Sequence, residues 1–218
     1  MKTYNELAQS VTFIKVGSSI ILKGSNPLLD CVGKGRSAYA FRIKSTNKVL
    51  KVFFPPFSHL AEEEAEIYIK LQGISYYSRL HDYGDNYLVV DYIEGKTLFQ
   101  CLVQGVSVKK EYLLEADKAL KLAKQRGLNP SDIHLRNIFI TKNGTIKIID
   151  VARYRQTKHC SQWEDIKLAL EKYYLQQGVP VKVPTVFLNV IACLYKKNYL
   201  RRYVTKLPSN ARNKKQIV

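Results

Sequence analysis

The sequence lacks the features that mark secreted, disulfide-stabilised and membrane-spanning proteins. Its four cysteines are scattered, with no CxxC pair and no ligand-like spacing, so we expect reduced thiols and no zinc site. No run of about 18 apolar residues occurs, which argues against a membrane-spanning helix. The first residues, MKTYNELAQS, lack the basic segment and the apolar segment of a signal peptide. These absences predict a cytoplasmic protein.

Acidic residues are also scarce in this chain. The sequence has 18 Asp and Glu residues against 35 Lys and Arg residues, which gives a formal net charge of +17 at pH 7. A field of this sign attracts nucleic acid, ribonucleoprotein, acidic proteins or nucleotide phosphates, so we expect an acidic or nucleic-acid-associated partner. A Lys-rich solvated surface without such a partner is the alternative.

Apolar residues make up 46% of the 218 residues, enough to bury a core, and their spacing changes along the chain. Alternation and turn signals predict strands within 11–23, 28–43, 48–54 and 79–95, with one helix at 59–72. Helical spacing follows at 111–127, 161–177 and 184–202, with one hairpin after the first of these. The predicted fold class is α+β, with an antiparallel β-sheet lobe followed by a small, mainly helical lobe. The expected parts are an N-terminal lobe at 1–90, a hinge at 91–96, a C-terminal lobe at 97–207 and a basic tail at 208–218.

The stretch SDIHLRNIFITKNGTIKIID (131–150) predicts a β-hairpin with polar side chains at its open end. Asn143-Gly144 favours a two-residue type I′ turn, because both central positions of that turn need positive φ. A hairpin brings Asn137, before its first strand, close to Asp150, after its second, and Asp132 lies on the preceding loop. Carboxylate and amide oxygens suit Mg²⁺, and a further carboxylate can orient an attacking hydroxyl. A loop in which Asp132 and Asn137 only satisfy backbone groups is the alternative.

Asp132, Asn137 and Asp150 keep the spacing of the catalytic core in the protein kinase-like superfamily. The form DIHLRN, with His134 two residues after the Asp, is similar to aminoglycoside and choline phosphotransferases and to RIO-type atypical kinases. The resemblance implies a bilobal kinase-like fold, ATP and Mg²⁺ as cofactors, Asp132 as the catalytic carboxylate, and Asn137 and Asp150 as metal ligands.

The first 95 residues carry further parts of this resemblance. VGKGRSAYA (32–40) resembles the glycine-rich loop over the ATP phosphates, with Gly33 and Gly35 in place. VLKVF resembles the strand with the ATP-binding lysine, which makes Lys51 the candidate, and a lysine inside an apolar strand otherwise needs a reason. LVVDYIEGKTL resembles the hinge, where backbone groups of Asp91 and Ile93 would bind the adenine edge.

A carboxylate on the next helix is expected to hold the candidate lysine. Glu62, Glu63, Glu64 and Glu66 all compete for this role. Glu64 fits best, because it lies three and seven residues before Ile67 and Leu71 on the inward stripe of the helix. The other acids then form a solvated face.

Three departures from the family pattern stand near the catalytic loop. DVA (150–152) replaces DFG, and NPSD (129–132) stands where HRD or HGD is usual. Only residues 151–162 separate Asp150 from Trp163, which leaves no room for a long activation segment. The chain therefore resembles a minimal, atypical kinase in which phosphorylation of an activation loop is not expected.

These residues predict an ATP- and Mg²⁺-dependent phosphotransferase, with serine or threonine of a protein as the leading acceptor. Four basic residues directly after the metal-binding Asp are expected to place an acidic or nucleic-acid-associated substrate: Arg153, Arg155, Lys158 and His159. Two alternatives stay open. One is a small-molecule kinase acting on a sugar or metabolite, and the other is a pseudokinase-like, ATP-binding regulator associated with nucleic acid.

Overall fold

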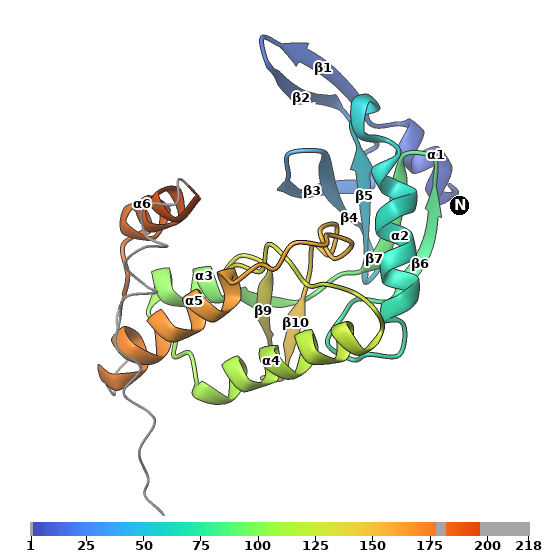
Figure 1. The fold of residues 1–218 in the computed structure, drawn as a ribbon. Coiled ribbons are helices and arrows are strands. Elements are labelled where there is room, and N and C mark those ends of the chain that lie inside the picture. The colour runs from blue at the N-terminus through green and yellow to red at the C-terminus, as the bar shows by residue number, and fades with distance from the viewer. Residues whose placement is uncertain (1, 178–181, 197–218) are drawn as a thin grey trace, which may run out of the picture.

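A computed structural model describes residues 2–177 and 182–196, and Figure 1 shows the arrangement of their elements. The helices are α1 (Tyr4–Gln9), α2 (Leu60–Leu71), α3 (Leu98–Gln104), α4 (Lys110–Gln125), α5 (Gln162–Ala169) and α6 (Thr185–Lys196). The strands are β1 (Thr12–Val16), β2 (Ser19–Gly24), β3 (Leu29–Lys34), β4 (Ala38–Ile43), β5 (Lys48–Phe53), β6 (Leu80–Gly84), β7 (Tyr87–Asp91), β8 (Gly95–Thr97), β9 (Ile138–Thr141) and β10 (Ile146–Ile148).

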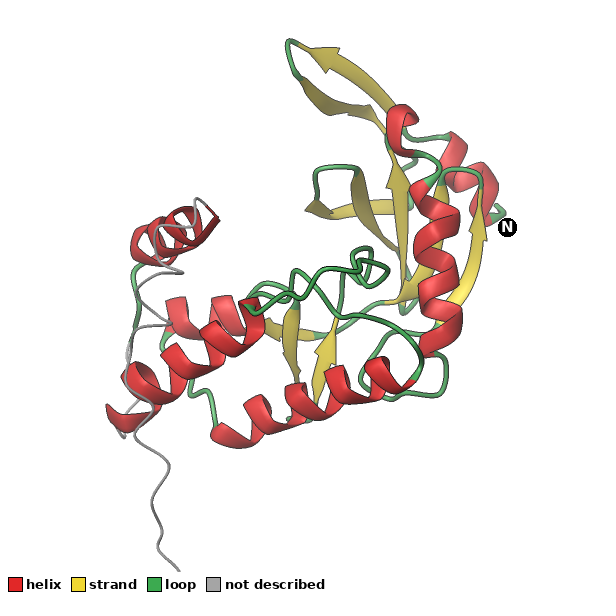
Figure 2. Ribbon diagram, viewed as in Figure 1, coloured by secondary structure: helices red, strands yellow, loops and turns green. Residues whose placement is uncertain are grey.

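The N-terminal part is built on a five-stranded antiparallel sheet, and the C-terminal part is mainly helical (Figure 2). The order of the large sheet is β3-β4-β5-β7-β6, with β1 and β2 forming a separate hairpin that extends away from it. A smaller sheet of order β10-β9-β8 lies beside α4 in the C-terminal part. The predicted α+β class, with a sheet first and helices after it, is therefore confirmed.

The alternation of side chains along β5 divides the core around the large sheet. Leu50 and Val52 point to one face and are fully buried with residues of α1, among them Leu7. The next side chains, Lys51 and Phe53, point to the opposite face, because successive residues of a strand face opposite sides. That second face is covered by α2, so the strand itself directs a lysine toward a helix.

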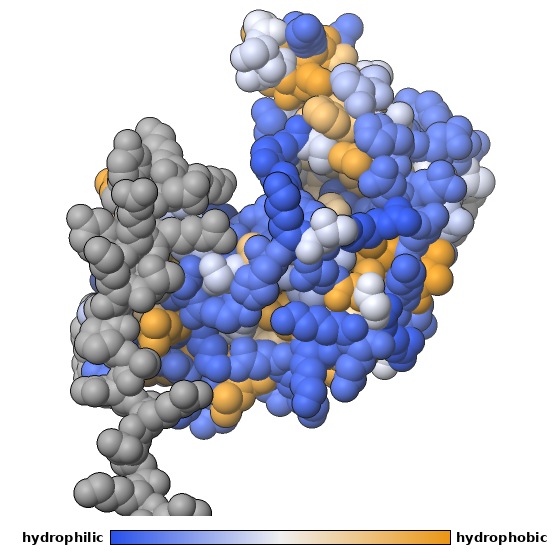
Figure 3. Space-filling view, in the orientation of Figure 1, coloured by the Kyte–Doolittle hydropathy of each residue, from blue (hydrophilic) through white to orange (hydrophobic). Residues whose placement is uncertain are grey.

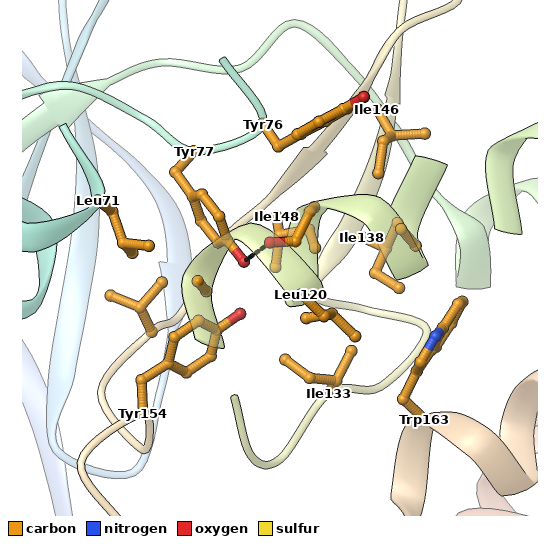
Figure 4. Packing of buried hydrophobic residues seen from close by; sticks show 14 of the residues in the cluster. Leu71, Tyr76, Tyr77, Leu120, Ile133, Ile138, Ile146, Ile148, Tyr154 and Trp163 are labelled. Carbon is orange, nitrogen blue, oxygen red and sulfur yellow. Dashed lines mark hydrogen bonds between the residues drawn. The ribbon is translucent and has the colours of Figure 1, made fainter. Parts of the chain in front are cut away.

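The core on the α2 side continues into the C-terminal part, where several of its members meet in Figure 4. The rings of Tyr77 and Tyr154 pack edge to face, with centroids 6.0 Å apart, and the Tyr77 hydroxyl donates to the Ala119 carbonyl at 3.2 Å. Trp163 at the start of α5 donates its indole N–H to Asp117 of α4 at 2.7 Å. These contacts fix the loops between the hairpin and α5 against α4.

The hairpin between β9 and β10 forms as predicted, but its turn is different. Only Gly144 has positive φ, at 73°, and Asn143 does not, so the predicted type I′ turn is wrong. The Gly144 amide donates to the Thr141 carbonyl at 3.0 Å, and the Thr141 amide donates to the Thr145 carbonyl at 2.9 Å. This wider loop needs one residue of positive φ, which the glycine supplies.

The predicted helices of the C-terminal part also need correction at their ends. The predicted helix at 161–177 is α-helical only to Ala169 and then continues as a π-turn at Leu170–Tyr174 and a 3-10 turn at Leu175–Gln177. Leu170 and Tyr174 are both buried, so the wider turn keeps two apolar side chains in the core. The end of the predicted helix at 184–202 and the basic tail at 208–218 lie outside the described residues.

Candidate active site

Lys51 of β5 lies between two carboxylates from separate elements. Its Nζ donates to both oxygens of Glu64 on α2, at 2.8 and 2.6 Å, and lies 3.6 Å from Oδ1 of Asp150. Glu64 is buried, whereas Glu62, Glu63 and Glu66 are exposed. Of the four acids that the sequence leaves as candidates, the structure thus brings Glu64 to the lysine.

Burial and charge act on this pair in opposite directions. Burial disfavours the ammonium of Lys51, but the charges of Glu64 and Asp150 outweigh this effect and raise the pKa of Lys51 above its ordinary value of 10.5. Burial also raises the pKa of the Glu64 carboxyl, and the Lys51 ammonium limits that rise. Lys51 therefore remains positively charged. It lies between the buried Glu64 and the exposed Asp150, and an anionic ligand that binds beside Asp150 can contact it.

The hairpin brings the predicted metal ligands to one place, at its open end. The Ile149 amide donates to the Asn137 carbonyl at 2.9 Å, so the residues that precede Asp150 run beside Asn137. The Asn137 side chain is buried, and its Nδ2 donates to the Asp132 carbonyl at 3.2 Å. Asp132 and Asp150 have φ of 61° and 58°, a strained region that Asp and Asn tolerate best among residues with a side chain.

The donor set at this point fits Mg²⁺ better than a metal held by protein ligands alone. No group of three or more His, Cys, Asp or Glu side chains that could hold a metal exists among the described residues. Mg²⁺ is usually bound by one or two carboxylates together with phosphate oxygens and water. The Asp150 side chain is 54% exposed and can provide such an oxygen, and Asn137 can provide an amide oxygen.

The predicted glycine-rich loop joins β3 to β4 at the edge of the large sheet. The Gly35 amide donates to the Ala38 carbonyl at 2.8 Å. Neither Gly33 nor Gly35 has positive φ, and a Cβ added to either would lie 3.5 Å or more from its nearest neighbour. The fold alone therefore does not demand glycine at these positions, whereas the close approach of a ligand to the backbone would.

The backbone groups of the predicted hinge residues differ in whether they are free to bind an adenine ring. The Asp91 amide donates to the Arg79 carbonyl at 3.2 Å, and its carboxylate lies 2.7 Å from His81 and accepts from the Arg79 amide at 2.8 Å. The Asp91 carbonyl accepts a long hydrogen bond of 3.4 Å from the Ser78 hydroxyl, and a carbonyl oxygen has two lone pairs. An adenine contact by Asp91 would thus use this carbonyl, and Ile93 follows beyond the end of β7.

Asn129, for which the sequence pattern indicated no role, holds the predicted catalytic loop in place. Asn129 donates its Nδ2 to the carbonyls of Gln156 and Lys158, at 2.7 and 3.1 Å, and its amide donates to the Tyr154 carbonyl at 2.8 Å. Tyr154 is fully buried. The loop that lacks the usual histidine is therefore tied to residues 154–158 by the residue two positions before Ser131. In the sequence, the only sign of this role is that Asn129 stands in NPSD, where the family usually has HRD or HGD.

The four predicted basic residues after Asp150 are all exposed, but two of them make ion pairs with acids of the chain. Arg155 makes an ion pair with Glu66 of α2 at 2.6 Å, and both side chains are about half exposed. Arg153 lies 3.4 Å from the Asp132 carboxylate, and Arg36 of the glycine-rich loop approaches the same oxygen to 3.6 Å. The sequence indicated neither contact with Asp132.

Comparisons with known proteins bear on this site. No protein-family model matches the sequence. A Bacillus subtilis protein, “Putative serine/threonine-protein kinase YrzF”, is 40% identical over 199 residues, which are 90% of this chain and 93% of that protein. “Probable serine/threonine-protein kinase CPE1738” from Clostridium perfringens is 27% identical over 148 residues, which are 60% of this chain and 22% of that protein.

A solved structure supports the fold. The crystal structure of WbdD superimposes with a TM-score of 0.52 at 16% sequence identity, over 88% of this chain and 49% of the WbdD chain. The present chain thus spans about half the length of WbdD. At this identity the likeness concerns the fold alone, and it agrees with the predicted sheet lobe and helical lobe. Among the described residues, no helix has the length and apolar character needed to cross a membrane.

Proposed function

Because this chain belongs to the serine/threonine protein kinases of the protein kinase-like superfamily, we propose that it transfers the γ-phosphoryl group of ATP to serine or threonine hydroxyls of a protein. The observation that carries this proposal is the contact of Lys51 with both Glu64 and Asp150. A lysine fixed by one buried carboxylate and directed at a second, exposed carboxylate is suited to a phosphate chain that a metal ion bridges.

Each residue of the site has one task in the proposed reaction. Lys51 binds phosphate oxygens, and Asp150 and Asn137 would hold Mg²⁺, which when bound neutralises charge that develops on the phosphates. Asp132 orients the acceptor hydroxyl. It accepts the hydroxyl proton as the oxygen bonds to phosphorus and the bond to the departing ADP oxygen breaks. Gly33, Gly35, Asp91 and Ile93 are proposed to line the nucleotide site through their backbone groups.

The proposal is tested by incubating the purified chain with γ-labelled ATP, Mg²⁺ and dephosphorylated casein. We expect label on serine and threonine of casein or of the chain itself, and no label in the presence of EDTA. Asp150→Asn is the matched control, because asparagine tolerates a φ of 58° but carries no charge. Transfer only to an added sugar or metabolite would favour a small-molecule kinase, and ATP binding without transfer would favour a regulator.

We further propose that the enzyme is of an atypical type that lacks a regulatory activation segment. Three features of residues 154–158 support this. Tyr154 is buried, the carbonyls of Gln156 and Lys158 accept hydrogen bonds from Asn129, and Arg155 makes an ion pair with Glu66. Glu66 lies on the same helix as Glu64, so this short segment contacts the helix that positions Lys51. None of these contacts needs a phosphate group.

Removal of phosphate from the purified chain is therefore expected to leave its initial rate of transfer within about twofold. Arg155→Ala should lower that rate by less than about fivefold, because half-exposed ion pairs contribute only about 0.2–1 kcal/mol. The measurement is the initial rate before and after phosphatase treatment, with the phosphatase removed. A fall of more than tenfold after treatment would show that phosphorylation activates the enzyme.

A further inference from the structure

Two guanidinium groups from different lobes contact the carboxylate of Asp132, which is proposed to bind the acceptor hydroxyl. Arg36 reaches it from the loop between β3 and β4, with its Nη2 3.6 Å from Oδ2 of Asp132. Arg153 reaches the same oxygen from the segment after Asp150, with its Nε at 3.4 Å. Apart from the grey residues, the face of the molecule seen in Figure 3 is mostly hydrophilic.

These contacts are too weak to lock the site. The side chains of Arg36 and Arg153 are 78% and 45% exposed. Exposed ion pairs are weak, so for each of these contacts the paired state is only a few times more populated than the separated state. An arriving ligand can therefore displace both guanidinium groups from Asp132 at little cost.

The two arginines are also not needed to position Asp132. The Asn137 side chain binds the Asp132 carbonyl, and the Ser131 hydroxyl donates to the Asn129 carbonyl at 3.0 Å in the same loop. The neighbouring Arg155 differs from Arg153, because it pairs with Glu66 of α2 and not with Asp132. Arg36 and Arg153 thus present two displaceable positive charges at the point where the acceptor must bind.

Resting on the proposed function, we propose that Arg36 and Arg153 are specificity-determining residues that select acceptors with a carboxylate or phosphate beside the hydroxyl. Guanidinium groups match both anions with paired hydrogen bonds. Because an extended chain advances about 3.3–3.6 Å per residue, an anion one or two residues from the acceptor lies within the reach of an arginine side chain. When that anion binds the arginines, it releases the Asp132 carboxylate to take the acceptor hydroxyl.

The test compares peptides that share a central serine and differ in the two flanking positions, which carry glutamate, phosphoserine, alanine or lysine. With Mg²⁺ and ATP, we expect kcat/KM for the glutamate and phosphoserine peptides to exceed that for the lysine peptide by roughly tenfold or more. Arg153→Glu and Arg36→Glu should each reduce this ratio, and the double variant should reverse it. Arg153→Gln tests the same contact without a new charge.

Lys121→Glu is the matched control, because it makes the same change in net charge on the exposed side of α4 and should leave the ratio unchanged. Thermal unfolding verifies that each variant is folded. Equal kcat/KM for all four peptides would overturn the inference and leave the proposed function intact. An altered KM for ATP with an unchanged acceptor ratio would also overturn it, and would assign the arginines to the nucleotide. If no phosphate were transferred to any acceptor, whether the peptides, casein or the chain itself, both proposals would be overturned.

Discussion

Asp132→Asn is expected to lower kcat by on the order of 10²–10⁴-fold, because the carboxylate that we propose as the acceptor of the hydroxyl proton is lost. Thermal stability should change little. Asp132 has a φ of 61°, which asparagine tolerates, and the Asn137 side chain binds the backbone carbonyl at this position rather than the carboxylate. Steady-state kinetics at saturating ATP, together with thermal unfolding, measure the two effects separately.

Asp132→Ala provides the comparison for this variant. Alanine in the left-handed region costs roughly 1–2 kcal/mol, so this variant should lose stability as well as activity. If Asp132→Asn kept its kcat within about fivefold of the original, Asp132 would not be the proton acceptor. The first proposal would then need a different residue in that role.

Lys51→Met is expected to weaken the proposed binding of ATP phosphates and to destabilise the fold by about 3 kcal/mol at pH 8. The loss of stability arises because Glu64, whose side chain is 2% exposed, would keep its charge without a partner. Burial raises the pKa of Glu64 above its ordinary value of 4.5, and nothing would oppose that rise in the variant. Urea unfolding at several pH values measures the effect.

The sign of the pH dependence follows from this raised pKa. A carboxyl with a raised pKa in the folded state stabilises the protein fully below its unfolded pKa, and this stability is lost as the pH rises through the folded pKa. The unfolding free energy of Lys51→Met should therefore fall from about pH 4.5 upward. Lys51 of the original chain keeps its charge throughout this range, since its pKa is raised above 10.5.

The double variant Lys51→Met with Glu64→Gln is the control for the buried charge. It has nearly the same size and hydrogen-bonding shape as Lys51→Met, but no carboxyl to titrate. The fall in stability between pH 4.5 and 8 should disappear in it. A single variant Lys51→Met with the same stability at both pH values would show that the Glu64 charge is solvated, and would contradict the buried pair.

Periodicity determined much of this site without any tertiary information. Alternation in β5 places Lys51 opposite Leu50 and Val52, and helical spacing in α2 separates Glu64 from the exposed acids around it. Both are local rules of side-chain direction. The hairpin follows in the same way from two apolar strands around Asn143-Gly144, although the turn adopts a different conformation.

The sequence by itself thus determined the α+β class and the lysine inside an apolar strand, and it favoured Glu64 among four competing acids on the next helix. Only the tertiary structure decided that Asn129 holds the loop before Asp132 and that Arg155 pairs with Glu66. It also brought Arg36 and Arg153 to the same carboxylate, that of Asp132. These contacts join loops far apart in the chain. Loops have no repeating side-chain direction, so their contacts depend on how the two lobes pack, and no local pattern encodes them.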